Sequence, residues 1–136
     1  MQHWTLTRDA DGLARLVFDR AGASANTLGA PVLAGFNEAL DLLDRDPPRG
    51  LVIARGKANG FIAGADVDEL TQITDEASAL ALVKRGWDTF ERLAAVKYPT
   101  VALIRGFCLG GGVELALACR YRVVVDEPGT RLGLPE

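Results

Sequence analysis

The first part of the chain changes from an alternating to a helical pattern of apolar positions. Residues 4–7 alternate and residues 13–18 are mostly apolar, with an Asp-Gly pair between the two segments, which predicts a β-hairpin. After Pro31 the apolar residues recur every three or four positions up to the Pro-Pro pair at 47–48. This spacing predicts a helix that ends before these prolines, with its apolar face at Leu33, Phe36, Leu40 and Leu43.

Two short apolar runs further along are typical of strands buried on both faces. Residues 51–54 and 101–104 are continuously apolar and are bounded by glycine or proline. The segment between them predicts a long helix that is capped by Thr74 or Asp75 and ends near Lys97. The apolar positions of this helix again recur at spacings of three or four: Leu80, Val83, Trp87, Phe90 and Leu93.

The last part of the chain predicts one more helix and one more strand. Residues 113–119 are small residues and good helix formers, and residues 121–125 form a further strand. The alternation of strands and helices predicts a single α/β domain with right-handed crossovers and largely parallel strands. We expect no closing strand or helix after this point, and therefore expect the chain to be a fragment of a longer domain.

Composition and charge narrow the class of protein. The 136 residues carry 15 Lys and Arg against 18 Asp and Glu, a net charge of -3, and the two signs are mixed along the chain. The chain therefore lacks the basic patch of a nucleic-acid-binding protein, and no nucleic-acid partner is expected. No apolar run is long enough to span a membrane and the N-terminus lacks a secretory signal pattern, which favours a cytoplasmic protein without membrane insertion.

The cysteine and histidine content gives little support for a metal site. Cys108 and Cys119 are not spaced as CxxC, and His3 is the only histidine, so a zinc site is not expected. We expect both cysteines to be buried free thiols. His3 lies on the first predicted strand, far from either thiol in sequence, which also disfavours a Cys/His or Ser/His catalytic pair.

Two glycine-bearing loops are candidates for ligand binding. Residues 60–66 and 106–114 each follow a predicted buried strand, and open α/β sheets bind ligands at the carboxyl ends of their strands. Glycine lets the backbone approach a ligand with its N–H groups, which suits an oxyanion that develops during a reaction. A tight strand-to-helix turn without a ligand is an equal alternative for Gly110-Gly111-Gly112. The GxGxxG and GxxxxGK[ST] patterns of nucleotide-binding loops are absent.

Two glutamates are candidates for acid/base chemistry. Glu114 falls just inside the helix predicted after the second loop, and Glu136 follows an apolar Leu-Pro pair. Hydration of a double bond requires one group that takes a proton from water and one that gives a proton to carbon, roles that two carboxyl groups can share. A first-turn glutamate favoured by the helix dipole, and an exposed chain end, are the simpler alternatives.

Three further acidic residues lie after the first loop. Asp66, Asp68 and Glu69 lack the remaining spacing of a calcium-binding loop, and we interpret them as acids at the start of a helix.

Three motifs in order carry a resemblance to a known family. The segments FIAGADVDE at 61–69, GFCLGGGVELALAC at 106–119 and LGLPE at 132–136, together with Asn26-Thr27-Leu28, resemble the enoyl-CoA hydratase/isomerase (crotonase) family. More narrowly they are similar to the hydratase region at the N-terminus of the α subunits of bacterial fatty acid oxidation complexes. The resemblance implies an α/β crotonase-like spiral of ββα units, of which residues 1–136 would be the N-terminal portion of the hydratase/isomerase domain, truncated on its C-terminal side.

The resemblance also implies roles for individual residues. The N–H groups of Ala65 and Gly111 would form an oxyanion hole for a thioester, Glu114 would mainly activate water, and Glu136 would mainly deliver a proton to carbon. Coenzyme A would lie along residues 24–28 and 61–66. Its expected contacts are Ala25, Ala63, Asp66 and Gly110.

The implied activity is hydration of 2-enoyl-CoA in β-oxidation, and enoyl-CoA isomerase activity is a further expectation. Coenzyme A would be part of the substrate, and no separate cofactor is expected. The implied assembly is a homotrimer or membership of a fatty acid oxidation complex. Two alternatives stay open: a non-catalytic fragment or assembly module of a larger multifunctional enzyme, and a hydrolase or dehalogenase on the same scaffold, for which the sequence offers no convincing nucleophile.

Overall fold

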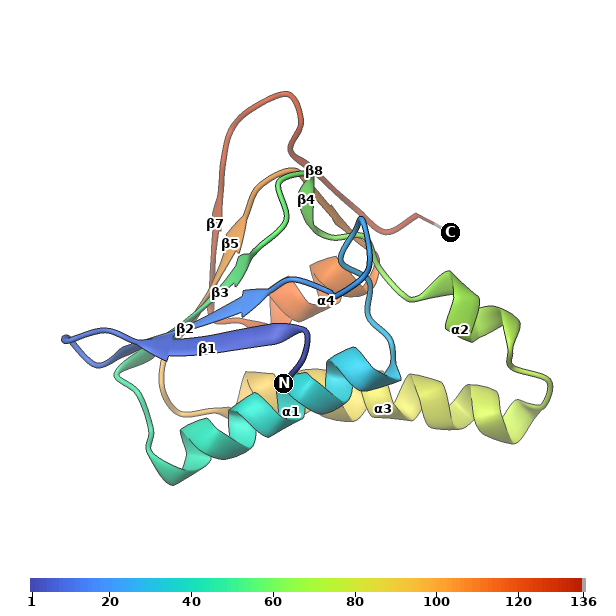
Figure 1. The fold of residues 1–136 in the computed structure, drawn as a ribbon, viewed down its shortest axis with the longest axis horizontal. Coiled ribbons are helices and arrows are strands. Elements are labelled where there is room, and N and C mark those ends of the chain that lie inside the picture. The colour runs from blue at the N-terminus through green and yellow to red at the C-terminus, as the bar shows by residue number, and fades with distance from the viewer. Residues whose placement is uncertain (136) are drawn as a thin grey trace.

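The fold is a five-stranded sheet with helices against one face and a small second sheet at one end (Figure 1). The computed structural model describes residues 1–135. The first sheet has the spatial order β1 (Trp4–Arg8), β2 (Leu13–Phe18), β3 (Gly50–Arg55), β5 (Thr100–Ile104) and β7 (Tyr121–Val124). The helices are α1 (Ala30–Arg45), α2 (Val67–Thr71), α3 (Glu76–Ala95) and α4 (Gly111–Ala118).

The first sheet confirms the predicted pairing. β1 and β2 form an antiparallel hairpin in which Trp4 lies opposite Phe18, and β2, β3, β5 and β7 follow one another in parallel. The turn of the hairpin is fixed by Asp9, whose Oδ1 accepts from the N–H groups of Asp11 and Leu13 at 2.9 and 3.0 Å. Parallel strands β3 and β5 are largely buried, as their continuous apolar runs predict.

The second sheet was not predicted. It consists of β4 (Gly60–Ile62), β6 (Phe107–Leu109) and β8 (Arg131–Gly133), all parallel. The sequence predicts loops for the first two segments and no strand after residue 125, and both predictions are wrong. Strands of three residues are too short to show a period of two, so only their pairing with one another identifies them.

The helix ends are set by local chemistry. Pro31 lies in the first turn of α1, and α1 ends at Arg45, ahead of Pro47 and Pro48. Asp75 is the N-cap of α3, since its carboxylate accepts from the Ser78 N–H at 2.6 Å, which decides between the two predicted caps. Both long helices are therefore confirmed to within two or three residues.

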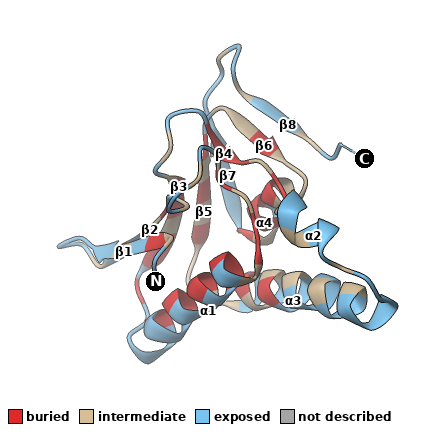
Figure 2. Cartoon of the chain, turned by 45° about the vertical axis from the view of Figure 1, so that its right-hand side comes forward, coloured by how far each residue is buried: buried red, intermediate tan, exposed pale blue. Residues whose placement is uncertain are grey.

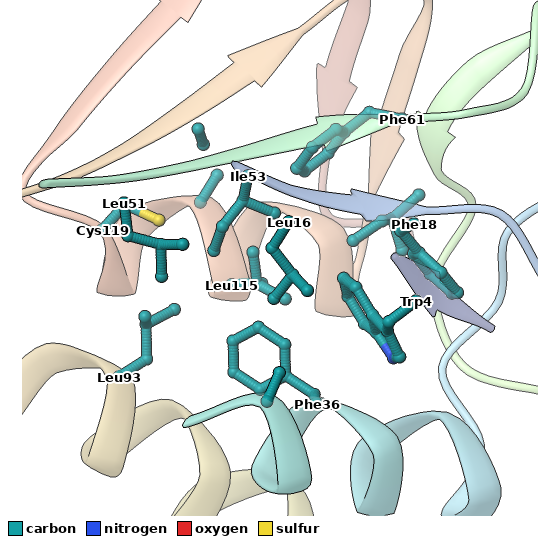
Figure 3. Packing of buried hydrophobic residues seen from close by; sticks show 14 of the residues in the cluster. Trp4, Leu16, Phe18, Phe36, Leu51, Ile53, Phe61, Leu93, Leu115 and Cys119 are labelled. Atoms are coloured by element: carbon teal, nitrogen blue, oxygen red, sulfur yellow. The ribbon is translucent and has the colours of Figure 1, made fainter. Parts of the chain in front are cut away.

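The main core lies between the first sheet and α1 (Figure 3). The rings of Trp4 and Phe18 stack with centroids 4.3 Å apart, and Phe36 of α1 packs on Trp4 at 5.1 Å. The indole Nε1 donates to the carbonyl of Val32 at 2.8 Å, so the one polar atom of this cluster is paired.

Both cysteines are free and buried, as predicted. Cys108 lies on β6 and Cys119 at the end of α4. Burial raises the pKa of each thiol to about 11, so both are protonated and unreactive near neutral pH.

Burial is uneven between the two long helices (Figure 2). α1 buries seven residues along one face, whereas α3 buries only Thr89 and Leu93 near its C-terminal end. The exposed part of α3 extends beyond α1, toward α2. Within residues 1–135 no helix is both long enough and apolar enough to cross a membrane.

Candidate functional site

The exposed part of α3 forms one wall of a cavity of about 580 Å³. The other walls come from α2, α4, the turn at Ala65 and Asp66, and the segment at the start of α1 with Leu28 and Leu33. The cavity is bordered by four of the residues predicted for the site: Ala65, Asp66, Gly111 and Glu114. The two glycine-bearing segments, more than 40 positions apart in the sequence, are thus brought to one place by the fold.

Glycine allows the two segments to touch. A Cβ atom on Gly112 would lie 2.8 Å from the Cβ atom of Ile62, closer than real side chains approach, so α4 can begin against β4 only because position 112 has no side chain. Gly110 has a φ of +53°, a conformation that other residues rarely adopt, and the position of its Cβ would be 3.7 Å from the Cα atom of Gly64. The turn before α4 therefore rests on the turn before Ala65.

Neither Ala65 nor Gly111 donates its N–H group to another residue within 1–135. Ala65 forms an isolated parallel bridge with Leu28, in which Gly64 and Asp66 make the hydrogen bonds, at 2.7 and 3.0 Å, so the Ala65 N–H points elsewhere. Gly111 is the first residue of α4, where backbone N–H groups have no partner in the helix. The cavity thus has two backbone donors at its border, one of them at a helix N-terminus with its positive partial charge.

Glu114 is the carboxylate closest in sequence to these donors. It lies in the first turn of α4, is exposed, and borders the cavity. No ion pair or side-chain hydrogen bond joins Glu114 to another of the described residues, so its carboxylate is available to a ligand. Glu136, the second predicted catalytic carboxylate, lies outside the described residues.

The other carboxylates at the cavity differ in how far they are engaged. Asp66 is the N-cap of α2, with Oδ1 accepting from the Asp68 N–H at 3.1 Å, and its Oδ2 accepts from Arg20 at 2.9 Å. Glu69 accepts from the Ala30 N–H at 2.8 Å. These contacts confirm that the acidic residues after the first loop start a helix. Glu91, on α3, is exposed and faces the same cavity.

Three predicted coenzyme A contacts do not border this cavity. Ala25, Ala63 and Gly110 are half-buried and are not among its lining residues. The Ala63 N–H donates to the carbonyl of Asn26 at 2.7 Å, and the Gly110 N–H donates to the carbonyl of Gly133 at 2.9 Å, so both amides serve the protein itself.

Two residues position the site through contacts that the sequence did not predict, although Asn26 belongs to the Asn26-Thr27-Leu28 motif and to the 24–28 segment expected along coenzyme A. Asn26 is fully buried, accepts from the Arg20 N–H at 2.8 Å, and donates to the carbonyls of Phe18 and Phe61 at 2.8 and 3.1 Å. Arg20 in turn holds Asp66, the residue after Ala65. The partners of Asn26 and Arg20 lie up to 46 positions away, so no local sequence pattern could have predicted these contacts.

The remaining cavity wall is mainly apolar. It includes Leu82, Val83, Trp87, Phe90 and Ala94 of α3, opposite Leu70 and Leu117. Apart from Glu69 and Glu91, the polar groups lie at the turn and the start of α4, which suits a ligand with one polar end and one apolar end. Within residues 1–135 no three His, Cys, Asp or Glu side chains are grouped so as to hold a metal ion.

Comparison with known proteins identifies the family of the chain. The sequence model of the family described as enoyl-CoA hydratase/isomerase matches residues 8–136. The chain belongs to the enoyl-CoA hydratase/isomerase family. This confirms the family that the three motifs indicated.

The relatives in this family include subunits of multifunctional complexes. The chain is 46% identical over 134 residues to the fatty acid oxidation complex subunit alpha of Shewanella sp. (strain W3-18-1), and 42% identical over 132 residues to that of Aliivibrio fischeri. These alignments cover 98% and 96% of this chain but only 19% of each relative. The chain therefore corresponds to the N-terminal fifth of these subunits.

Solved structures of the family have the same fold. The enoyl-CoA hydratase from Bacillus anthracis superposes with a TM-score of 0.88 at 26% identity, over 98% of this chain and 50% of that chain. The enoyl-CoA hydratase from Thermoplasma volcanium gives 0.88 at 26% identity, over 100% and 52%. The predicted α/β crotonase fold is confirmed, and the chain spans about half of it, the N-terminal portion.

Proposed function

We propose that the protein hydrates the double bond of a 2-enoyl-CoA thioester to give a 3-hydroxyacyl-CoA, as a step of fatty acid β-oxidation in the cytoplasm. The observation that carries the proposal is the pair of N–H groups on Ala65 and Gly111, accepted by no residue within 1–135, on the border of the cavity that contains Glu114. Membership of the family and identity to fatty acid oxidation complex α subunits support the same assignment.

The two N–H groups are proposed to bind the thioester oxygen. When water adds to the β carbon, electrons move through the alkene onto this oxygen, which becomes an enolate. Two fixed donors stabilise that charge more than the neutral carbonyl, and loss of one such donor typically lowers kcat by roughly 10²–10³-fold. The N-terminus of α4 contributes positive partial charge in the same direction.

Glu114 and Glu136 are proposed to handle the protons. Glu114 takes a proton from water as the water oxygen bonds to the β carbon, and Glu136 gives a proton to the α carbon as the enolate collapses. The position of β8 supports a role for Glu136, because Gly133 accepts from the Gly110 N–H and ties the segment that leads to Glu136 to the turn before α4.

Coenzyme A is proposed to lie along residues 24–28 and 61–66, with Ala25, Ala63, Asp66 and Gly110 as contacts. It enters as part of the substrate, so the reaction requires no separate cofactor. Because the carboxylate oxygens and the backbone N–H of Asp66 already make hydrogen bonds within the protein, we expect its contact with coenzyme A to be a packing contact. The proposed assembly is a homotrimer or a fatty acid oxidation complex.

Substitution of single carboxylates in the intact protein tests the mechanism. Glu114→Gln keeps the shape of the side chain but removes the base, and we expect kcat for hydration of a short 2-enoyl-CoA to fall by roughly 10²–10⁴-fold. Hydration is monitored through the loss of ultraviolet absorbance of the substrate. Glu91→Gln is the matched control, because Glu91 borders the same cavity from α3 and has no proposed role; it should stay near the wild-type rate. Glu136→Gln should also lose activity, and full hydration by this variant would contradict the two-carboxylate scheme.

The alternative is a non-catalytic module of a larger multifunctional enzyme. It predicts that the intact wild-type protein binds acyl-CoA but converts no enoyl-CoA, by hydration or by shift of the double bond. If this is observed, and Glu114→Gln binds acyl-CoA as tightly as the wild type, the proposed hydratase function is rejected in favour of the non-catalytic module.

A further inference from the structure

The apolar wall of the cavity has a gap at Gly86. Leu82, Gly86, Phe90 and Ala94 are each four positions apart on α3, so they form one row along the helix, and all four line the cavity. Gly86 is the one position of this row without a side chain.

Neither helix formation nor packing explains a glycine at this place. Gly86 lies in the interior of a regular helix of 20 residues, where glycine is less stable than alanine because it has more conformational freedom to lose. Its φ is not positive, so its backbone does not require glycine. Among residues 1–135 no heavy atom lies within 4 Å of the place where its Cβ would be, so none of these residues excludes a larger side chain. The missing side chain instead leaves empty space in the cavity.

The gap lies on the mainly apolar wall that α3 contributes to the site. Leu82 and Phe90 flank it on α3, while the N–H donors and Glu114 belong to other elements. A thioester held at Ala65 and Gly111 would direct its acyl chain toward apolar walls, and each methylene removed from water adds roughly fourfold to affinity.

We infer that Gly86 is a specificity-determining residue, whose absent side chain makes room for the distal part of a long acyl chain, so that the substrates are long-chain rather than short-chain 2-enoyl-CoA thioesters. The inference rests on the proposed function and deepens it. Residues larger than glycine at position 86 would shorten the longest acyl chain that the cavity accepts.

The test compares Gly86→Leu and Gly86→Ala in the intact protein, with Ala81→Leu as the matched control. Ala81 lies on the same helix, is exposed, and is outside the cavity lining, so Ala81→Leu places the same side chain on α3 without filling the gap. Gly86→Ala guards against misfolding, because alanine favours the helix at an unstrained position. For each variant, kcat/KM is measured with one short-chain and one long-chain 2-enoyl-CoA.

We expect Gly86→Leu to lower kcat/KM for the long-chain substrate by roughly tenfold or more, equivalent to two or more methylenes returned to water, and to leave the short-chain value unchanged. Gly86→Ala should give a smaller loss of the same selectivity, and Ala81→Leu none. Equal losses at both chain lengths, or no loss at either, would overturn the inference.

Binding of saturated acyl-CoA, measured by calorimetry, separates this inference from the proposed reaction. Saturated thioesters cannot be hydrated, so their affinity reports the cavity alone. If Gly86→Leu weakens the long saturated acyl-CoA only, the inference stands even where hydration fails. If the wild type and Gly86→Leu have the same affinity for the long saturated acyl-CoA and the same affinity for the short one, the inference is overturned, whether or not hydration proceeds.

Discussion

Helices α1 and α3 have the same apolar spacing but use it differently. α1 buries seven residues between the sheet and the neighbouring helix, Leu40 and Phe36 completely. On α3 the predicted apolar positions Leu80, Val83 and Trp87 are 62%, 67% and 64% exposed. Apolar periodicity thus identifies a helix with one apolar face, and it does not distinguish a face that packs in the core from one that borders a binding cavity.

The difference arises within α3 itself. Its C-terminal half is joined to α1, where Asn37 donates to the Thr89 hydroxyl at 2.9 Å and Arg92 donates to Asn37 and to the carboxylates of Asp41 and Asp44. Its N-terminal half extends past α1 (Figure 1) and contributes Leu82 and Val83 to the cavity. The C-terminal half lines the cavity as well, from Gly86 to Ala94, so the contacts with α1 and the cavity wall lie on different faces of the same segment. One helix therefore serves both as part of the scaffold and as part of the site.

The largest expected effect comes from truncating matched leucines on the two helices. Leu40→Ala removes a completely buried side chain from α1, and we expect the free energy of unfolding to fall by about 2–5 kcal/mol. Leu80→Ala removes an exposed side chain from α3, and the change should stay within roughly 0.5 kcal/mol. Urea unfolding of the intact protein measures both. Similar losses in the two variants would show that the face of α3 is packed after all, and would break the comparison.

A smaller effect is expected from the contact between the two helices. Arg92→Met keeps the aliphatic stem but removes donors to Asn37, Asp41 and Asp44, and we expect about 1 kcal/mol of lost stability, because the guanidinium is partly shielded while both aspartates are exposed. Part of the difference should disappear at high salt, which screens the ion pairs.

Lys84→Met is the control for that contact. Its ion pair with Asp88 lies within α3 and is exposed on both sides, so no measurable loss is expected. Equal losses of stability in Arg92→Met and Lys84→Met would mean that the contact with α1 does not hold the C-terminal half of α3.

The smallest expected effect is at the N-terminus of α3, which depends on its cap. The hydrogen bond from the Ser78 backbone N–H, and then that from its side chain, lowers the pKa of Asp75 below its usual 3.8. Because the pKa of Asp75 is lower in the folded state, the contribution of Asp75 to the free energy of unfolding is present above pH 3.8 and is lost as the pH falls through the folded-state pKa.

Hydrogen exchange of α3 amides, recorded between neutral and acid pH, tests the cap. Protection of the first turn of α3 should decrease at low pH in the wild type. Asp75→Asn retains an acceptor for the Ser78 N–H but does not titrate, so its protection should not follow the same pH dependence. If both proteins lost protection in parallel, another group would control the N-terminal half.

Much of the fold could be predicted because it depends on neighbouring residues. The Asp-Gly turn of the first hairpin, the prolines that bound α1, and the Asp75 cap act over four residues or fewer, and their patterns are visible in the chain. The motifs around Ala65, Gly111 and Glu114 were visible for the same reason, since each is a short continuous segment.

The sequence by itself determined the hairpin, the long helices, the buried strands and the family. Only the tertiary structure decided that three short segments pair as a second sheet, that Arg20 reaches Asp66 across 46 positions, and that one apolar face of α3 borders a cavity. The physical reason is range: caps, turns and periodicity are set by interactions within a few residues, whereas strand partners, distant ion pairs and burial depend on which surfaces the folded chain brings together.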